Sequence, residues 1–378
     1  MNIKKIPITD NAEEQFQIGR ELASVYSDDM IRSVKKTIDK LWNESCGHTK
    51  TELLYRSVYD YWVYGFTADQ EIYYKLADKT HTEKDNYLTY HNKWLYFDRL
   101  NLRENMHMLE NKYEAYELMK PYYKREIIKI ENESDYSAFL DFVGRHSSFV
   151  AKPLGLSCAA GVQKMDASDY PDIKTMFLAA LRIGSDCEGE YKFKGCPKGA
   201  VVLEEMIIQD PEIAKIHPWS INGVRITTIR IGDKVHIYYP WLKLGCHKEF
   251  ISSAAIGSMD AGIDSVTGVI NTDGCTEDGN FLVYQPDTNI RIKGFVIPKW
   301  QELVDMATEL ANFLPSSINY VGWDFALTPT GWCVMEANYY GNVMWQMFLG
   351  KGMKHEFEEL IGWKPDKKFW WQYGAPKF

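Results

Sequence analysis

The chain has no apolar stretch long enough to cross a membrane and no pattern of paired cysteines. Its 378 residues include only seven cysteines, which are scattered and odd in number. A spanning helix needs about 20 consecutive apolar residues, and residues 1–10 lack the apolar run that a signal peptide requires. We therefore expect a reduced, cytoplasmic protein without a transmembrane segment, a disulfide framework or a zinc site.

Positive charge is outnumbered by negative charge, which limits the kinds of partner. The 52 acidic side chains outnumber the 43 lysines and arginines and give a formal net charge of −9. This balance argues against general nucleic-acid binding. It does not exclude a nucleotide ligand, because a local cluster of basic side chains is enough to hold phosphate groups.

Aromatic residues are abundant, at 14% of a composition that is otherwise typical of a folded protein. The length suggests two or three subdomains. Many of the tyrosines fall in the N-terminal part, where they suggest a carbohydrate-stacking surface at first sight. A helical core packed with tyrosine is the more ordinary explanation. The aromatic residues concerned are Tyr55, Tyr59, Tyr61, Trp62, Tyr64, Tyr73 and Tyr74.

The order of helical and β patterns indicates how the chain is organised. Apolar residues at three- and four-residue spacing predict helices in the N-terminal part, and short β runs alternate with helices from residue 126 onward. Helices interleaved with mostly antiparallel strands imply an α+β fold. The expected helices are 11–41, 51–64, 69–76, 105–123, 136–145, 173–183 and 299–314, and the expected strands are 127–130, 149–152, 200–207, 224–231 and 235–242.

The segment from Asn319 to Asn338 has the pattern of two strands joined by the turn Thr328–Gly331. In a hairpin of this length Asp324 and Glu336 lie nearly opposite one another, and Asn338 lies on the same face as Glu336. Two carboxylates and an amide oxygen form a site suited to Mg²⁺ bound together with nucleotide phosphates. The alternative is that both acids are solvated or salt-bridged.

A lysine and a run of small residues follow the expected strand 149–152. The segment from Lys152 to Gly161 offers a compact charge for phosphate oxygens and room for backbone N–H groups to approach them. It is not a Walker A loop, because the Gly-Lys-Ser/Thr ending is missing. An ordinary loop is the alternative, and Cys158 is better explained as a small residue in a small space than as a nucleophile.

Two further segments place charged residues on strands. The run that ends in Glu204 and Glu205 is either an ordinary edge or a hinge, where main-chain groups of Glu205 and Ile207 pair with an adenine. Arg225 points away from its apolar neighbours, so its fork needs a phosphate or carboxylate partner. Lys243 falls nearby if its strand and the strand of Arg225 form a hairpin.

This ordered set of residues resembles the ATP-grasp superfamily over about residues 105–345. The motifs Val-Gly-Trp-Asp, Met-Glu-Ala-Asn and Pro-Trp-Ser-Ile-Asn-Gly-Val-Arg look most like the branch of sugar-transfer-associated ATP-grasp proteins. The likeness implies two α+β lobes that clamp ATP, preceded by a helical N-terminal region. The implied divisions are 1–104 for the helical region, 105–208 for the N-terminal lobe, and 209–378 for the C-terminal lobe with the metal site and tail.

The resemblance also implies roles for individual side chains. Some would contact the ATP phosphates, some would line the adenine pocket, some would bind Mg²⁺, and two would act in catalysis. Of these two, Arg225 would stabilise the γ-phosphate or an acyl phosphate. The residues are Lys112, Lys152 and Ser157 for the phosphates, Glu204, Glu205 and Ile207 for the adenine, Asp324, Glu336 and Asn338 for Mg²⁺, and Arg225 and Lys243 for catalysis.

Most ATP-grasp enzymes make an acyl phosphate from a carboxylate and ATP, and an amine or thiol then displaces phosphate. The resemblance thus implies an ATP- and Mg²⁺-dependent carboxylate–amine ligase, which would join a sugar acid to an amino acid or amine in surface-polysaccharide biosynthesis. Two alternatives stay open. One is a small-molecule kinase that stops after phosphoryl transfer, and the other is a non-catalytic nucleotide-binding scaffold.

The C-terminal segment 367–373 combines basic and aromatic residues, Lys-Lys-Phe-Trp-Trp-Gln-Tyr. Such a mixture suits a membrane interface, so peripheral membrane contact is one interpretation. A tail that packs against the body of the protein is the simpler one.

Overall fold

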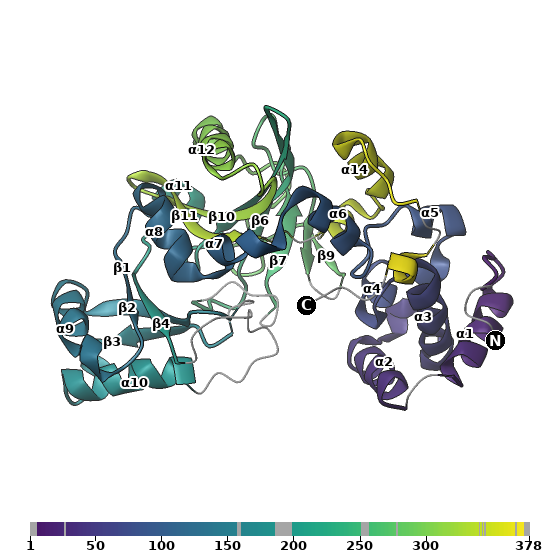
Figure 1. Ribbon diagram of the computed structural model, residues 1–378, viewed down its shortest axis with the longest axis horizontal. Coiled ribbons are helices and arrows are strands. Elements are labelled where there is room, and N and C mark those ends of the chain that lie inside the picture. Colours follow the sequence, from purple (N-terminus) through teal and green to yellow (C-terminus); the bar gives the residue numbers. More distant parts are fainter. Residues whose placement is uncertain are drawn as a thin grey trace. The chain divides into compact units, whose positions relative to one another are not determined.

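The computed structural model divides the chain into two compact units, the helical unit and the sheet unit. The helical unit contains Met1–Leu100, Thr272–Leu282 and Asn342–Phe378, and the sheet unit contains Asn101–Asn271 and Val283–Gly341. Figure 1 shows their elements. The residues that the structure describes are 6–25, 28–156, 160–185, 199–250, 257–276, 279–339, 341, 343, 345–366 and 369–373.

Short helices make up most of the helical unit. The longest, α3 (Lys50–Tyr64), begins with a capping box in which Thr49 and Glu52 each accept the other's backbone N–H, and it ends at Gly65, whose φ of 86° favours glycine. The other elements are α1 (Ala12–Ala23), α2 (Asp28–Leu41), α4 (Ala68–Tyr73), α5 (His81–Asp85), α6 (Lys93–Leu100), α13 (Trp345–Leu349), α14 (Lys354–Ile361) and the hairpin of β8 (Gly274–Thr276) and β9 (Phe281–Leu282).

Aromatic side chains fill the core of the helical unit. Tyr59, Tyr64 and Tyr74 are buried, which confirms that these tyrosines belong to a core. The C-terminal segment packs on α3, because the indole N–H groups of Trp370 and Trp371 donate to backbone carbonyls of that helix at 2.7 and 3.1 Å. The docked tail is therefore confirmed for residues 369–373, whereas Lys367 and Lys368 lie outside the described residues.

Helix α1 packs unusually close to α3. A methyl group added at Gly19 would come within 1.8 Å of the carbonyl oxygen of Tyr55. We expect Gly19→Ala to destabilise the helical unit by about 1–3 kcal/mol, because the two backbones must separate. Hydrogen exchange of the α1 and α3 amides measures the effect.

The matched control is Gly144→Ala in α9 (Tyr136–Arg145), where nothing lies within 4 Å of the added methyl group. There alanine should stabilise the helix by up to about 1 kcal/mol. Equal effects of the two substitutions would contradict the close packing of α1 on α3.

The sheet unit contains two antiparallel sheets. The first is four-stranded, and α9 and α10 (Ile173–Ser185) cover one of its faces (Figure 1). Phe139, Phe142 and Phe177 from these helices form one core with Phe149 of the sheet. In order across the sheet, its strands are β1 (Ile127–Ile130), β4 (Val201–Glu205), β2 (Ser148–Pro153) and β3 (Gln163–Asp166).

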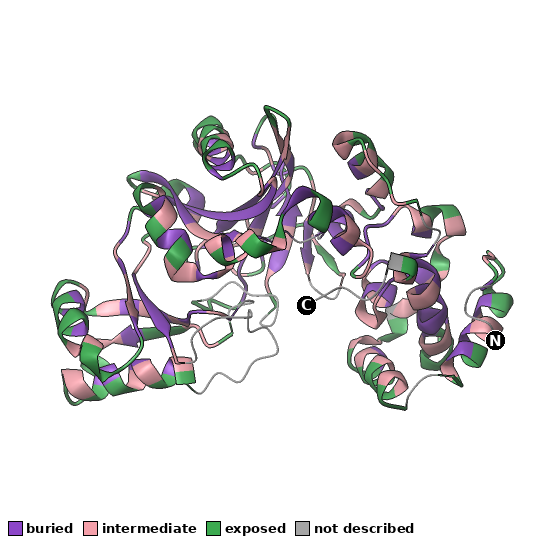
Figure 2. Ribbon diagram, in the orientation of Figure 1, coloured by how far each residue is buried: buried purple, intermediate pink, exposed green. Residues whose placement is uncertain are grey.

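In the second sheet of this unit, β10 lies next to the edge strand β11 and is buried on both faces over most of its length (Figure 2). Helix α12 (Trp300–Phe313) packs on β5 and β6. Arg230, on the face opposite Arg225, donates to carbonyls at the end of α12 at 2.9 Å, so α12 covers that opposite face. In order, these strands are β11 (Gly331–Asn338), β10 (Tyr320–Thr328), β5 (Gly223–Ile231), β6 (Lys234–Leu244) and β7 (Met259–Gly262).

The remaining helices of the sheet unit are α7 (His107–Glu110), α8 (Lys112–Tyr123) and α11 (Pro211–Ala214). Helix α8 lies against both β1 and β11. Pro121 lies inside it rather than at its end, because the backbone kinks at Met119 (φ −120°, ψ 24°) and then continues.

The predicted strands and the helices 136–145, 173–183 and 299–314 are confirmed to within about two residues. The predicted segment 11–41 is two helices, α1 and α2. In the part of the chain that the structure describes, no helix combines the length and hydrophobicity needed to cross a membrane.

Candidate functional site

The predicted hairpin of β10 and β11 is present, with an irregularity at its centre. Asp324 pairs with Glu336, and Gly322 pairs with Asn338. The register then shifts, so that Phe325 pairs with Val334. Opposed residues of antiparallel strands point to the same face, so the register predicted for the two acids is confirmed. Bulges of this kind are common beside active sites, where they redirect a side chain.

The polar row continues across the rest of the sheet. Arg225 of β5 lies opposite Asp324, on the face away from α12. Lys243 of β6 pairs with Gly223, two residues from Arg225 on the same face, and Asp260 of β7 pairs with Lys243. The β5–β6 hairpin that was expected to bring Lys243 near Arg225 is confirmed. Asp260 was not predicted, since only the pairing of β7 places it in this row.

Asp324 is the most heavily paired side chain of the row. It is only 7% exposed, and Arg225 donates from Nε and Nη2 to its two oxygens at 2.7 Å each. Lys243 Nζ lies 2.9 Å from Oδ1, and Asn338 Nδ2 lies 3.3 Å from Oδ2. Asp324 is therefore salt-bridged, and its carboxylate is the partner of the Arg225 fork.

The pKa of Asp324 follows from these contacts. Burial alone would raise the pKa of Asp324, but the charges of Arg225 and Lys243 and their hydrogen bonds outweigh it and hold that pKa well below its usual range. Asp324 is therefore ionised at neutral pH. Arg225 stacks over the ring of Trp241 at 5.5 Å, which also fixes the plane of its guanidinium.

Glu336 is less constrained than Asp324. Its side chain is 38% exposed, and Lys112 Nζ lies 3.6 Å from Oε1. Lys112 is the first residue of α8, and it also donates to the carbonyl of Leu156 at the start of the small-residue loop. Lys112 thus joins β11 to this loop, as a phosphate-binding lysine would need to do. Ser157 and Cys158 lie outside the described residues.

A second charged cluster involves Lys152, Glu204 and Arg125. Lys152 and Glu204 lie on the face of the four-stranded sheet that faces away from its helices, and Lys152 Nζ is 2.9 Å from Glu204 Oε1. Arg125 donates to Glu204 Oε2 at 2.7 and 3.1 Å. Its Nη1 and Nη2 also donate to the carbonyls of Val334 and Met335 at 2.5 and 3.2 Å.

Arg125 thus connects β4 to the residues just before Glu336. Sequence reasoning missed it, because it lies at the edge of a β run without a motif around it. What marks Arg125 as important in the structure is its burial, since only 9% of the residue is exposed. Charged residues are rarely buried unless paired, so this arginine is expected to position the strand that carries Glu336.

Glu204 predicts a specific pH dependence. Burial raises its pKa, but the charges of Lys152 and Arg125 outweigh this and lower the pKa from 4.5 to about 2. Because the native pKa is below the unfolded one, the stabilisation is present above pH 4.5 and is lost as the pH falls through about 2. The shift corresponds to about 3 kcal/mol.

Urea unfolding of wild type and Glu204→Gln between pH 5 and pH 2 tests this expectation. The glutamine variant is less stable throughout, since Arg125 loses a partner, but its stability should depend less steeply on pH. Parallel pH profiles of the two proteins would contradict the lowered pKa of Glu204.

The hinge residues follow β4. The N–H of Glu205 donates to the carbonyl of Glu126 at 2.9 Å, and its carboxylate accepts the N–H of Glu126 at 2.9 Å. Its carbonyl is therefore the main-chain group that could serve an adenine. Ile207 is half-buried just beyond the strand.

The donor set can be tested against Mg²⁺. Among the described residues there is no cluster of three or more His, Cys, Asp or Glu side chains that could hold a metal ion. The amide nitrogen of Asn338 donates to Gly322 O at 3.1 Å and to Asp324, so its oxygen is the atom that a cation would meet. Glu336 and Asn338 could hold an ion that takes its further ligands from phosphates. Asp324 could join them only if its carboxylate bound the ion while still paired with Arg225 and Lys243.

Comparisons with known proteins found similar solved structures and one family model. A solved structure of the ATP-grasp ligase PsnB with a minimal precursor is 14% identical with a TM-score of 0.40, over 70% of this chain and 63% of that one. The D-alanine–D-alanine ligase of Helicobacter pylori is 12% identical with a TM-score of 0.40, over 68% and 62%. The chain thus spans less than two thirds of either protein.

No curated protein matches the chain. The family model of sugar-transfer-associated ATP-grasp proteins matches residues 92–361, which is most of the sequence. The fold is accordingly the expected α+β ATP-grasp fold with a helical N-terminal region. The chain belongs to the sugar-transfer-associated ATP-grasp family.

Proposed function

We propose that this protein is an ATP- and Mg²⁺-dependent carboxylate–amine ligase that acts through an acyl phosphate. The observation that carries the proposal is the row of charged groups on one sheet face. Three cations, Lys112, Arg225 and Lys243, surround the two carboxylates Asp324 and Glu336. Lys112 and Lys243 are partly exposed and can turn to the phosphates of a nucleotide, because a local cluster of basic side chains is enough to hold phosphate groups.

In this proposal each cation has a separate task. Lys112 of α8 and Lys152 of β2 contact the phosphates, together with Ser157. Lys243, whose side chain is 31% exposed, can leave Asp324 to meet the transferred phosphoryl group. Arg225 stays bound to Asp324 through Nε and Nη2. Its Nη1 lies next to Gly322, and a Cβ atom added to Gly322 would come within 3.0 Å of that nitrogen. A glycine there leaves Nη1 room to reach an oxygen of the phosphoryl group.

The nucleotide and its metal ion use the remaining residues. Glu336 and Asn338, with the shared Asp324, hold Mg²⁺, which offsets the charge of the phosphate oxygens. The Glu205 carbonyl and the main chain of Ile207 face the adenine, and Glu204 orients Lys152 beside it. Residues 105–208 and 209–378 would then form the two lobes around ATP.

The reaction can be written with its atoms balanced. A carboxylate oxygen of the substrate attacks the γ-phosphorus of ATP, the bond to the bridging oxygen breaks, and ADP leaves. The amine nitrogen then attacks the acyl carbon, phosphate leaves, and the amide loses a proton. The family's association with sugar transfer supports a carboxylated sugar as the acid and an amino acid or amine as the acceptor, in surface-polysaccharide biosynthesis.

The test is ADP release from Mg²⁺-ATP with panels of uronic acids and amino acids, with mass spectrometry of the products. The ligase proposal expects ADP, phosphate and an amide in equal amounts, only when acid and amine are both present. A stable phosphorylated product without the amine would instead support a kinase. ATP binding without ADP release in any pairing would favour the nucleotide-binding scaffold, and failure of the folded protein to bind ATP would overturn the proposal.

A further inference from the structure

Asp260 is a charged group of the site face that has no task in the proposed reaction. It is half-buried, and it pairs with Lys243 across the ladder of β6 and β7. Opposed residues of antiparallel strands point to the same face, with Cβ atoms about 4.5–5.5 Å apart. Lys243 Nζ reaches Asp324 Oδ1 at 2.9 Å on that face. Asp260 therefore lies beside the cations of the row.

The charge of Asp260 also acts on Arg225. Burial lowers the pKa of this arginine, but the charge of Asp324 and its hydrogen bonds outweigh burial, so the pKa is raised. The negative charges of Glu336 and Asp260 act in the same direction as Asp324. Asp260 thus shares the electrostatic environment of the arginine assigned to the transferred phosphoryl group.

The order of the strands separates Asp260 from the nucleotide. The end of the row assigned to the phosphates is at β11, where Lys112 Nζ lies 3.6 Å from Glu336 Oε1. Strand β7 lies beyond β10, β5 and β6, which places it about 19 Å from β11 at roughly 4.8 Å per strand. The attacking and leaving oxygens of a phosphoryl transfer are roughly in line. A substrate that approaches opposite the nucleotide therefore comes from the end that carries Asp260.

Glycine leaves this part of the face open. Gly223 pairs with Lys243, so a side chain at this position would point to the site face. The nearest described atoms to a Cβ added there are Met335 Sδ and the carbonyl oxygen of Phe325, both at 3.8 Å. A substrate can therefore approach Lys243 over this glycine.

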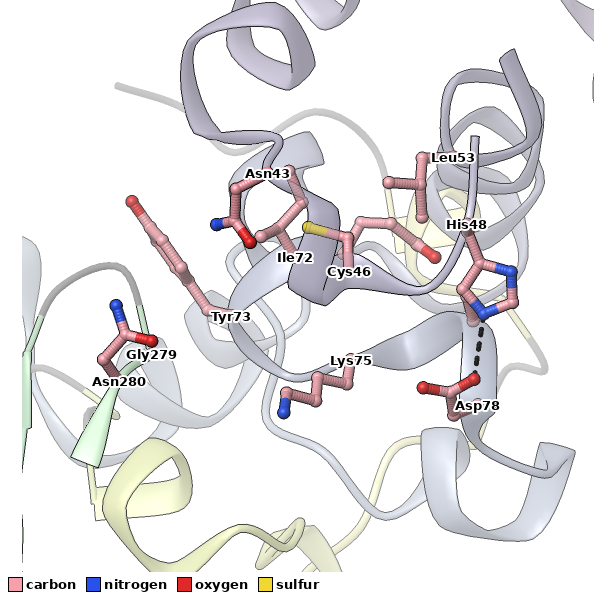
Figure 3. Close-up of a pocket in the computed structure, with 12 residues that line it drawn as sticks. Asn43, Cys46, His48, Leu53, Ile72, Tyr73, Lys75, Asp78, Gly279 and Asn280 are labelled. Atoms are coloured by element: carbon pink, nitrogen blue, oxygen red, sulfur yellow. Dashed lines mark hydrogen bonds and ion pairs between the residues drawn. The ribbon is translucent and has the colours of Figure 1, made fainter. Parts of the chain in front are cut away.

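A cavity in the helical unit is too small to receive a sugar acid. Its walls come from the turns 44–46 and 76–78, from α4 and from the segment before β9 (Figure 3). Its volume of about 50 Å³ holds about four water molecules, since each needs roughly 10–15 Å³. His48 Nε2 and Asp78 Oδ1 in its wall pair with each other at 2.9 Å. The charged row of the sheet unit is therefore the better place for the substrates.

The amide step needs a group that the row has not yet supplied. An amine is largely protonated at neutral pH, and its nitrogen has no free electron pair until a proton leaves. A carboxylate attracts the ammonium group and can take that proton. A carboxylate beside an anionic acyl phosphate is otherwise unfavourable, because like charges repel, unless a cation lies between them.

We propose that Asp260 binds the ammonium group of the amine substrate and accepts its proton, so that the site selects an amine rather than a thiol. This inference rests on the proposed ligase function and adds to it the residue that activates the nucleophile.

The protons of the amide step then balance. One proton of the ammonium group passes to a carboxylate oxygen of Asp260, and the freed electron pair of the nitrogen forms the C–N bond. The C–O bond to phosphate breaks, and phosphate leaves with that electron pair and takes the second proton of the nitrogen. Asp260 returns its proton to solvent.

The experiment compares two nitrogen nucleophiles in wild type and Asp260→Asn. Both proteins receive Mg²⁺-ATP and the panel of uronic acids, with either the panel of amino acids or hydroxylamine. Hydroxylamine is largely uncharged at neutral pH and traps an acyl phosphate as a hydroxamate without a base. Asp260→Asn should lower amide formation by about 10²–10⁴-fold, the usual contribution of a general base. Its hydroxamate formation should stay close to that of wild type.

Three further variants complete the test. Asp260→Ser should show the same selective loss, and Asp260→Glu should recover part of the amide formation. Asp233→Asn is the matched control, since it removes an exposed carboxylate from the turn between β5 and β6 and should leave both products unchanged.

The outcomes separate this inference from the ligase proposal. Equal losses of both products in Asp260→Asn and Asp260→Ser would indicate a structural role and overturn the inference, and so would unchanged amide formation. Hydroxamate from wild type without an amide from any amino acid would also overturn it. The absence of both products from wild type would overturn the ligase proposal, and this inference with it.

Discussion

Replacement of Asp324 by alanine lowers the free energy of unfolding of the sheet unit by about 3–5 kcal/mol. Arg225 is only 7% exposed, and without the carboxylate its charge is buried without compensation. The loss of the carboxylate costs less at Lys243, because its side chain is 31% exposed and can turn to solvent. Hydrogen exchange of the β5 and β10 amides measures the loss.

A double replacement separates charge burial from catalysis. In Asp324→Leu with Arg225→Met, both members of the buried pair become apolar, and such exchanges are often neutral or stabilising. We expect the double variant to recover most of the stability but none of the ATP-dependent activity. If Asp324→Ala alone is as stable as wild type, the ion pair with Arg225 does not form.

Glu336→Gln should lower the activity much more than the stability. Its side chain is 38% exposed and its contact with Lys112 is 3.6 Å long, so little stability depends on it. The change removes the carboxylate that can approach a metal ion most freely. We expect ADP formation to fall by about 10²–10³-fold, comparable with the loss of one electrostatic group in other active sites, while the unfolding midpoint stays close to that of wild type.

Steady-state ADP release as a function of Mg²⁺ measures this effect, and raised Mg²⁺ should restore part of the rate. Glu302→Gln is the matched control, since it removes an exposed carboxylate from α12, which packs on the other face of the sheet. Unchanged activity in Glu336→Gln would remove this residue from the site. Equal losses in both variants would point to a general charge effect.

Local patterns in the sequence predict much of the sheet unit. Period-two alternation around Asp324 predicts a strand, and the turn residues after Thr328 place Glu336 opposite it, as the register confirms. Such inferences succeed because a hairpin is a local structure whose register depends on its turn. The order of motifs likewise suggested the family that the family model confirms.

The state of the charged groups was harder to predict. The sequence left the partner of Arg225 open between a phosphate and a carboxylate, and its fork is held by Asp324 of the neighbouring strand. Arg125 and Asp260 carried no local signal. Ion pairs of this kind depend on which strands become neighbours, and residue spacing along one strand does not contain that information.

The sequence by itself determined the strand alternation, the β10–β11 turn and the order of the lysines, arginine and acids that mark the family. Only the tertiary structure decided that Asp324 is shared by two cations and that Arg125 connects β4 to the strand of Glu336. The physical reason is that local conformation follows from neighbouring residues, whereas burial and the pairing of charges follow from contacts between distant segments.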